Sequence, residues 1–120
     1  MRLLAIENDA PTRALLTALF GRDGIDVECV DSGSAALAKL GGGGYSAVLL
    51  DMMLSDIDGT QVLREMRFLA PELLTKTILL TTAPERTVDS SEREEVFAVL
   101  TKPFELADLT DTVRCCMSLN

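Results

Sequence analysis

The chain has 120 residues, of which 48% are hydrophobic and 25% charged, and its net charge is −8. Such a chain has the length of one domain with a core of its own, whereas its negative charge disfavours direct binding to nucleic acid or to anionic membranes. The sequence has no histidine, which excludes Ser/His and Cys/His catalysis, and its three cysteines lack disulfide or metal-ligand spacing and are therefore expected to be free thiols.

The first apolar run, residues 3–6, has the length of a buried strand and ends in the sequence Glu-Asn-Asp at residues 7–9. An acidic residue this close to the N-terminus excludes a secretory signal, and no apolar run approaches the ~20 residues that span a bilayer, so we expect a cytoplasmic protein. Pro11 then precedes apolar residues at intervals of three and four, which predicts an amphipathic helix that ends at residues 21–24.

Residues 25–30 alternate apolar and polar side chains, which is typical of a strand with one solvent-exposed face at the edge of a sheet. Helix-capping residues then precede a short helix over residues 35–40. Four glycines follow at residues 41–44. Because no strand precedes them and no Lys-Ser/Thr pair follows, we interpret them as a flexible connector and not as a phosphate-binding loop.

The central stretch of the chain is residues 47–50, which are wholly apolar and lead into Asp51 and an acidic turn that ends at Gly59. A short apolar run between turn signals predicts a strand that is buried on both faces, as in the middle of a parallel sheet. Asp51 would then lie at the carboxyl end of the strand, where open parallel sheets bind their ligands. Taken alone, this stretch leaves open that Asp51 is an ordinary surface carboxylate.

Two further elements follow the acidic turn. Residues 59–69 carry apolar side chains on one helical face, and residues 77–82 favour a buried strand that ends on the hydroxyl of Thr82. Residues 85–95 contain one aliphatic side chain, so a helix there would have almost no face to bury. We expect that segment to be short or mobile.

The fifth apolar run, residues 96–100, leads into Lys102, and helical spacing returns over residues 105–117. Five apolar runs thus alternate with helices, which predicts a parallel sheet covered on both faces, that is, a single-domain, three-layer α/β sandwich. The polar residues that end four of the runs would meet in one crevice at the carboxyl edge of the sheet. These residues are Glu7, Asn8, Asp9, Asp51, Thr82 and Lys102.

Four motifs therefore follow the predicted strands in order: the acidic cluster at residues 7–9, Asp51 with Asp58-Gly59, Thr82-Ala83, and Lys102-Pro103-Phe104. In these motifs the whole chain resembles the receiver domain of bacterial response regulators, the CheY-like family. The resemblance implies a flavodoxin-like (βα)5 fold with a five-stranded parallel sheet in the order 2-1-3-4-5. It also implies one receiver domain over residues 1–120, without an effector domain, and a cis peptide bond before Pro103.

The resemblance further implies a function in two-component phosphorelay signalling. Asp51 would accept a phosphoryl group from a histidine kinase or phosphotransfer protein, Lys102 and Thr82 would contact that group, and an unknown downstream protein or effector domain would respond. We expect no enzyme activity beyond self-catalysed phosphorylation and dephosphorylation. Magnesium would bind to the side chains of Glu7, Asn8 and Asp51 and to the backbone carbonyl of Met53, with Asp9 as a further candidate.

Two positions depart from the family pattern. Asn8 stands where the family has a second acid, which predicts weaker magnesium binding unless Asp9 compensates. Val99 stands where the family often has an aromatic residue that responds to the movement of the hydroxyl residue, so the coupling of Thr82 to the fifth strand is in doubt. Both departures favour an alternative function, that of a receiver-like interaction module that works without phosphorylation.

A third interpretation is a phosphatase of the haloacid dehalogenase type, which also uses an aspartyl nucleophile together with Thr and Lys. That class needs a second acid two residues after the nucleophile, and Met53 occupies this position. We therefore rank this interpretation last.

Overall fold

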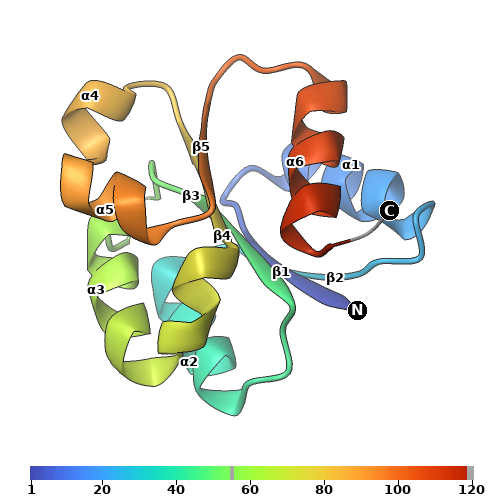
Figure 1. Cartoon of the computed structure of the whole chain (residues 1–120). Coiled ribbons are helices and arrows are strands. Elements are labelled where there is room, and N and C mark those ends of the chain that lie inside the picture. The colour runs from blue at the N-terminus through green and yellow to red at the C-terminus, as the bar shows by residue number, and fades with distance from the viewer. Residues whose placement is uncertain (55, 119–120) are drawn as a thin grey trace.

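The computed structural model describes residues 1–54 and 56–118. Within these residues five parallel strands form one sheet in the order β2-β1-β3-β4-β5, as predicted. Figure 1 shows helices on both faces of this sheet, which gives the expected three-layer α/β sandwich. The strands are β1 (Arg2–Ile6), β2 (Asp26–Val30), β3 (Ala47–Asp51), β4 (Thr77–Thr81) and β5 (Ala98–Thr101).

The helices divide between the two faces of the sheet. α1 and α6 cover one face, and α2 to α5 lie on the other (Figure 1). Two apolar clusters correspond to these two sides, one between the sheet and α1 and α6, the other between the sheet and α2 and α3. The helices are α1 (Ala10–Gly21), α2 (Gly33–Gly42), α3 (Gly59–Leu69), the 3-10 helix η1 (Pro71–Lys76), α4 (Pro84–Thr87), α5 (Ser90–Glu95) and α6 (Leu106–Cys116).

The central strand β3 is buried along its whole length, which explains its uninterrupted apolar sequence. Val48 and Leu50 belong to one apolar cluster, and Leu49 belongs to the other. A fully buried leucine contributes about 2 kcal/mol to folding, so the two clusters fix the strand firmly. The edge strand β2 is only partly buried, as its alternating sequence predicts.

Short polar side chains fix the start of the helices that follow β1, β2 and β3. The carboxylates of Asp9 and Asp58 and the hydroxyl of Ser32 accept hydrogen bonds from backbone N–H groups in the first turns of α1, α3 and α2, respectively. Each such cap stabilises its helix by about 1 kcal/mol. The loops at the carboxyl edge of the sheet are therefore held at their helical ends.

The structure corrects several predicted boundaries. α2 begins at Gly33 and includes Gly41 and Gly42, so the connector is shorter than the four glycines. β4 ends at Thr81, which leaves Thr82 just beyond the strand, and β5 begins at Ala98. η1 was not predicted, although its two leucines are buried.

The segment between β4 and β5 forms two short helices, in agreement with its poor apolar pattern. Polar contacts hold α5 in place. Asp89 and Glu92 form a reciprocal capping box, and the guanidinium of Arg67 in α3 donates two hydrogen bonds, of 2.8 and 2.6 Å, to the carboxylate of Glu95. Val88, between the two helices, and Val96, after α5, are buried apolar anchors of the segment.

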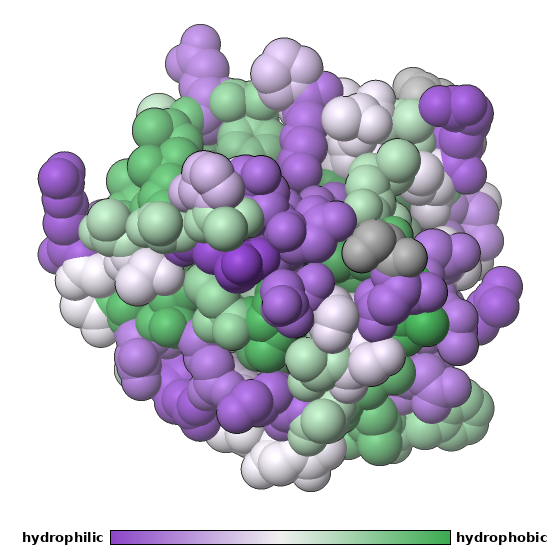
Figure 2. All heavy atoms as spheres, turned by 180° about the vertical axis from the view of Figure 1, so that it is seen from behind, coloured by the Kyte–Doolittle hydropathy of each residue, from purple (hydrophilic) through white to green (hydrophobic). Residues whose placement is uncertain are grey.

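Figure 2 shows the face of the molecule opposite to that in Figure 1, on which hydrophilic side chains are interspersed with smaller apolar areas. None of the helices in residues 1–54 and 56–118 combines the length and the hydropathy that a bilayer-spanning segment needs.

We expect Glu95→Gln to destabilise α5 locally by about 0.5 kcal/mol at pH 7, because a bidentate ion pair with Arg67 is lost. The hydrogen bond from Arg67 lowers the pKa of Glu95 below its ordinary value of 4.5. The contribution of the pair is therefore present above pH 4.5 and disappears as the pH falls through the lowered pKa. Amide hydrogen exchange of α5 over a pH series measures this effect.

Glu94→Gln is the matched control, since Glu94 is exposed and forms no ion pair among the described residues. Equal exchange rates in the two variants at pH 7 would contradict the role of the Arg67–Glu95 pair.

Candidate functional site

Two buried carboxylates lie side by side at the carboxyl edge of the sheet. Asp51 is the last residue of β3, and Glu7 directly follows β1; each is only 2% exposed. β1 and β3 are neighbours, and Ile6 pairs with Leu50, so the register brings Glu7 next to Asp51. The predicted convergence of these two residues is thus observed.

Lys102 provides the positive charge of this site. It follows β5, and its Nζ lies 3.3 Å from Asp51 Oδ2 and 3.7 Å from Glu7 Oε2. One ammonium group faces two carboxylates, so the three side chains together carry one net negative charge. The peptide bond between Lys102 and Pro103 is cis, which confirms the prediction from the family resemblance.

Backbone N–H groups orient both carboxylates. The N–H of Met53 donates to Asp51 Oδ1 over 2.9 Å, and the N–H of Asp9 donates to Glu7 Oε1 over 3.1 Å. Glu7 Oε2 is buried and has no hydrogen-bond partner among the described residues. Burial and, next in size, the charge of Asp51 raise the pKa of Glu7.

The remaining metal-ligand candidates, Asn8, Asp9 and Met53, are exposed. The carboxylate of Asp9 accepts hydrogen bonds from the hydroxyl and the N–H of Thr12 at the start of α1, and these bonds lower its pKa. Asp9 therefore already has a structural role as a helix cap. This argues against Asp9 supplying to a magnesium ion the negative charge that Asn8 lacks.

The donor set nevertheless fits a small divalent cation. Glu7 and Asp51 offer hard carboxylate oxygens, one of them buried without a hydrogen-bond partner, and such oxygens are the ligands that magnesium prefers. In the part of the chain that the structure describes, no three His, Cys, Asp or Glu residues form a metal-binding group. Neutral oxygens, such as the Asn8 amide and the Met53 carbonyl, would have to complete the set.

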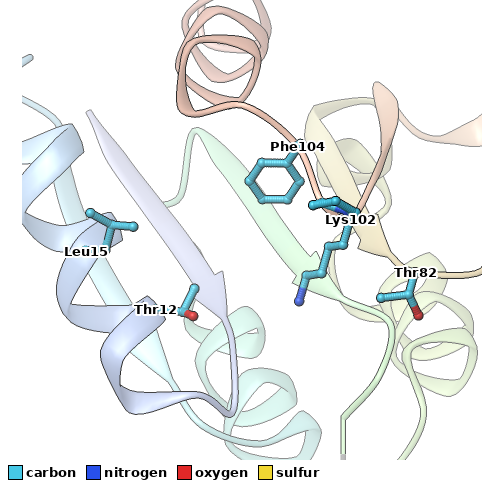
Figure 3. A pocket seen from close by; sticks show the side chains of 6 residues that line it. Thr12, Leu15, Thr82, Lys102 and Phe104 are labelled. Atoms are coloured by element: carbon cyan, nitrogen blue, oxygen red, sulfur yellow. The ribbon is translucent and has the colours of Figure 1, made fainter.

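Thr82 and Lys102 line a cavity of about 400 Å³, whose other lining residues are Thr12, Leu15, Pro103 and Phe104 and do not include Asp51 or Glu7. In Figure 3 the Lys102 side chain runs between Thr82 on one side and Thr12 on the other. Thr82 is exposed, whereas the hydroxyl of the neighbouring Thr81 is buried and bonded to Thr87 and to the N–H of Ala83. Thr82 is therefore the accessible hydroxyl of the pair.

Two residues near the site had no assigned role in the sequence analysis. The Arg13 guanidinium donates a 2.9 Å hydrogen bond to the backbone carbonyl of Glu7 and so fixes the loop after β1. Asp56, in the loop after β3, binds the start of α2. The sequence showed that this loop is acidic, but it did not indicate that Asp56 would bind Gly33 and Ser34 in α2.

Comparison with known proteins shows a consistent set of relatives. The family model of the response regulator receiver domain matches residues 3–114. The transcriptional regulatory protein TcrA of Mycobacterium tuberculosis is 34% identical; the match covers 95% of this chain and 45% of TcrA. The transcriptional regulatory protein PmrA of Pectobacterium parmentieri is 30% identical; the match covers 100% of this chain and 54% of PmrA. The chain thus spans about half the length of these relatives.

Solved structures agree with these sequence matches. The response regulator TrrA of Thermotoga maritima, solved in complex with Mg²⁺-BeF, has a TM-score of 0.82 and 26% identity, with 96% of this chain and 97% of that chain covered. A receiver domain from Clostridium thermocellum has the same fold, with a TM-score of 0.85 and 21% identity over 98% of this chain and 94% of its own. The sheet order, the residues at its carboxyl edge and these matches together show that the chain belongs to the response regulator receiver domain family of two-component systems.

Proposed function

We propose that the protein accepts a phosphoryl group on Asp51 from a histidine kinase or phosphotransfer protein. The observation that carries this proposal is the buried Asp51 carboxylate, which lies 3.3 Å from Lys102 Nζ at the edge of the sheet. In the reaction, an oxygen of Asp51 attacks the phosphorus of a phosphohistidine. A P–O bond forms, the P–N bond breaks, and its electron pair stays on the imidazole nitrogen.

The main obstacle to this reaction is repulsion between negative charges. Two like unit charges ~4 Å apart repel by about 4 kcal/mol at an effective dielectric constant near 20. Lys102 alone cannot offset both carboxylates and an arriving phosphoryl group. A bound magnesium ion would supply further positive charge, as supported by the buried Glu7 oxygen that has no hydrogen-bond partner among the described residues and by the magnesium in the solved TrrA complex. The residues that would hold it are Glu7, Asn8, Asp51 and Met53 through its carbonyl, with Asp9 as a weaker candidate.

Lys102 and Thr82 have their roles after phosphoryl transfer. The ammonium group would bind one phosphoryl oxygen, and the hydroxyl would donate to another. The 3.3 Å distance from Lys102 Nζ to Asp51 Oδ2 supports the role of Lys102, and Thr82 lines a cavity together with Lys102. Because these contacts form only in the phosphorylated state, they would shift the protein toward a conformation that a partner recognises.

The setting of the module within the cell is part of the same proposal. The relatives are named as transcriptional regulators and are about twice as long as this chain, so the downstream partner is proposed to be an effector domain or a separate protein. Cytoplasmic location, a single receiver domain over residues 1–120 and self-catalysed phosphorylation and dephosphorylation remain predictions.

The alternative functions have less support. An interaction module that works without phosphorylation would not need two carboxylates buried beside Lys102, which is a costly arrangement in the absence of a ligand. The family match over residues 3–114 favours a receiver over a phosphatase of the haloacid dehalogenase type.

Incubation with acetyl phosphate and magnesium should add the mass of one phosphoryl group to the wild-type chain and none to Asp51→Asn, because the variant lacks the nucleophile. Intact-mass spectrometry measures the product. Asp111→Asn, which changes an exposed carboxylate of α6, is the matched control and should be labelled like the wild type. Label on Asp51→Asn, or none on the wild type, would contradict the proposal.

Asn8→Asp should lower the magnesium concentration for half-maximal labelling by about tenfold, the scale on which changes around a bound metal alter its affinity. Asn8 offers an amide oxygen without a charge, so the wild-type site should bind magnesium more weakly than is usual in the family. Labelling yields of both proteins over a magnesium titration test this, and coincident curves would refute it.

Glu7→Gln should stabilise the metal-free protein by about 1 kcal/mol at pH 7, because it removes a buried charge beside Asp51. The same change should largely abolish the stabilisation that magnesium gives to the wild type. Urea unfolding with a chelator and with magnesium measures both effects. Glu65→Gln, at an exposed position of α3, controls for net charge, and equal responses of the two variants would oppose a special role for Glu7.

A further inference from the structure

The loop between β3 and α3 is anchored to a helix that lies outside the phosphoryl-acceptor site. The carboxylate of Asp56 accepts hydrogen bonds from the N–H groups of Gly33 and Ser34, at 3.0 and 3.1 Å, and from the hydroxyl of Ser34 at 2.9 Å. Gly33 and Ser34 are the first residues of α2. A carboxylate at this helix end also interacts favourably with the helix dipole.

A second contact joins the same two segments. Ile57, the neighbour of Asp56, occupies the space where a side chain of Gly33 would begin, so that any Cβ at position 33 would overlap it. The lack of a side chain at Gly33 thus allows Ile57 to pack closely against the start of α2. Apolar and polar contacts together fix Asp56 and Ile57 against the start of α2.

The same loop reaches Asp51 at its other end. The N–H of Met53 donates to Asp51 Oδ1 over 2.9 Å, and the carbonyl of Met52 accepts a hydrogen bond of 3.4 Å from the N–H of Gly59 at the start of α3. A shift of the loop would therefore move the donor that orients Asp51, together with the Met53 carbonyl assigned to the metal site.

We propose that Asp56 is a positioning residue that, by tying the β3–α3 loop to α2, holds Met53 in place and thereby sets the affinity of the site for a divalent cation. This inference rests on the proposed function. The N–H of Gly33, followed by those of Ile57 and Ser34, holds the pKa of Asp56 well below its ordinary value of 3.8. Asp56 therefore stays charged, and its hydrogen bonds persist, at neutral pH.

The matched control is Ser32→Ala. The Ser32 hydroxyl caps the same helix by accepting a 3.1 Å hydrogen bond from the N–H of Ala35. Loss of this cap weakens α2 without removing the hydrogen bonds that Asp56 accepts from Gly33 and Ser34. If Asp56 only stabilised α2, both variants would lower the stability of the protein and leave magnesium binding unchanged.

The test is isothermal titration calorimetry of magnesium with the full chain, combined with hydrogen exchange at the Met53 amide. Asp56→Ala should raise the magnesium dissociation constant by about tenfold, the lower end of the effects seen for residues that orient metal ligands. It should also speed exchange at Met53. Asp56→Asn keeps one oxygen acceptor and should have a smaller effect, and Ser32→Ala should match the wild type in both measurements.

The inference is overturned if Asp56→Ala binds magnesium as tightly as the wild type, or if Ser32→Ala weakens binding equally. If Asp56→Ala does not fold, Ser34→Ala removes only the hydroxyl bond to Asp56 and must weaken binding in the same direction. If the wild-type chain accepts phosphate on Asp51 but the Asp56 and Ser34 variants bind magnesium as tightly as the wild type, only this inference is refuted and the proposed function stands. A wild-type chain that neither binds magnesium nor accepts phosphate refutes the proposed function as well.

Discussion

The candidate site depends on the burial of two carboxyl groups next to each other, which the rest of the fold must support. Parallel pairing of β1 and β3 brings Glu7 beside Asp51, where both side chains are nearly inaccessible to water. Lys102 and two backbone N–H donors offset part of the repulsion. The apolar clusters on both faces of the sheet supply the stability that allows this arrangement to persist. One buried oxygen of Glu7 has no hydrogen-bond partner among the described residues, and hard carboxylate oxygens of this kind suit a divalent cation.

The sequence predicted the site better than it predicted the periphery, for a physical reason. Asp51 and Lys102 each follow an apolar run whose length indicates a buried strand, so their positions follow from the sheet. Thr82 was placed correctly within one residue of a strand end. In contrast, η1 has no apolar periodicity long enough to identify it, and the partner of Asp56 lies more than 20 residues away, in α2. Only the folded chain brings such partners together.

The two departures from the family pattern lie where the fold can absorb them. Asn8 is exposed after β1, and Val99 is partly buried, packed against the cluster beneath α2 and α3. Neither replacement disturbs the sheet register, since Val99 pairs normally with Leu79 in β4. Both departures therefore leave the architecture of the sheet unchanged.

The two short helices between β4 and β5 have a consequence for how the native protein opens. Val88 lies between them in the core, while polar contacts hold each helix: hydrogen bonds of Thr87 hold α4, and the capping box and the Arg67–Glu95 pair hold α5. Segments with little apolar burial open at a lower free energy than the sheet does. Residues 82–97 are therefore expected to open, and to become accessible to a protease, at a lower free energy than the five strands.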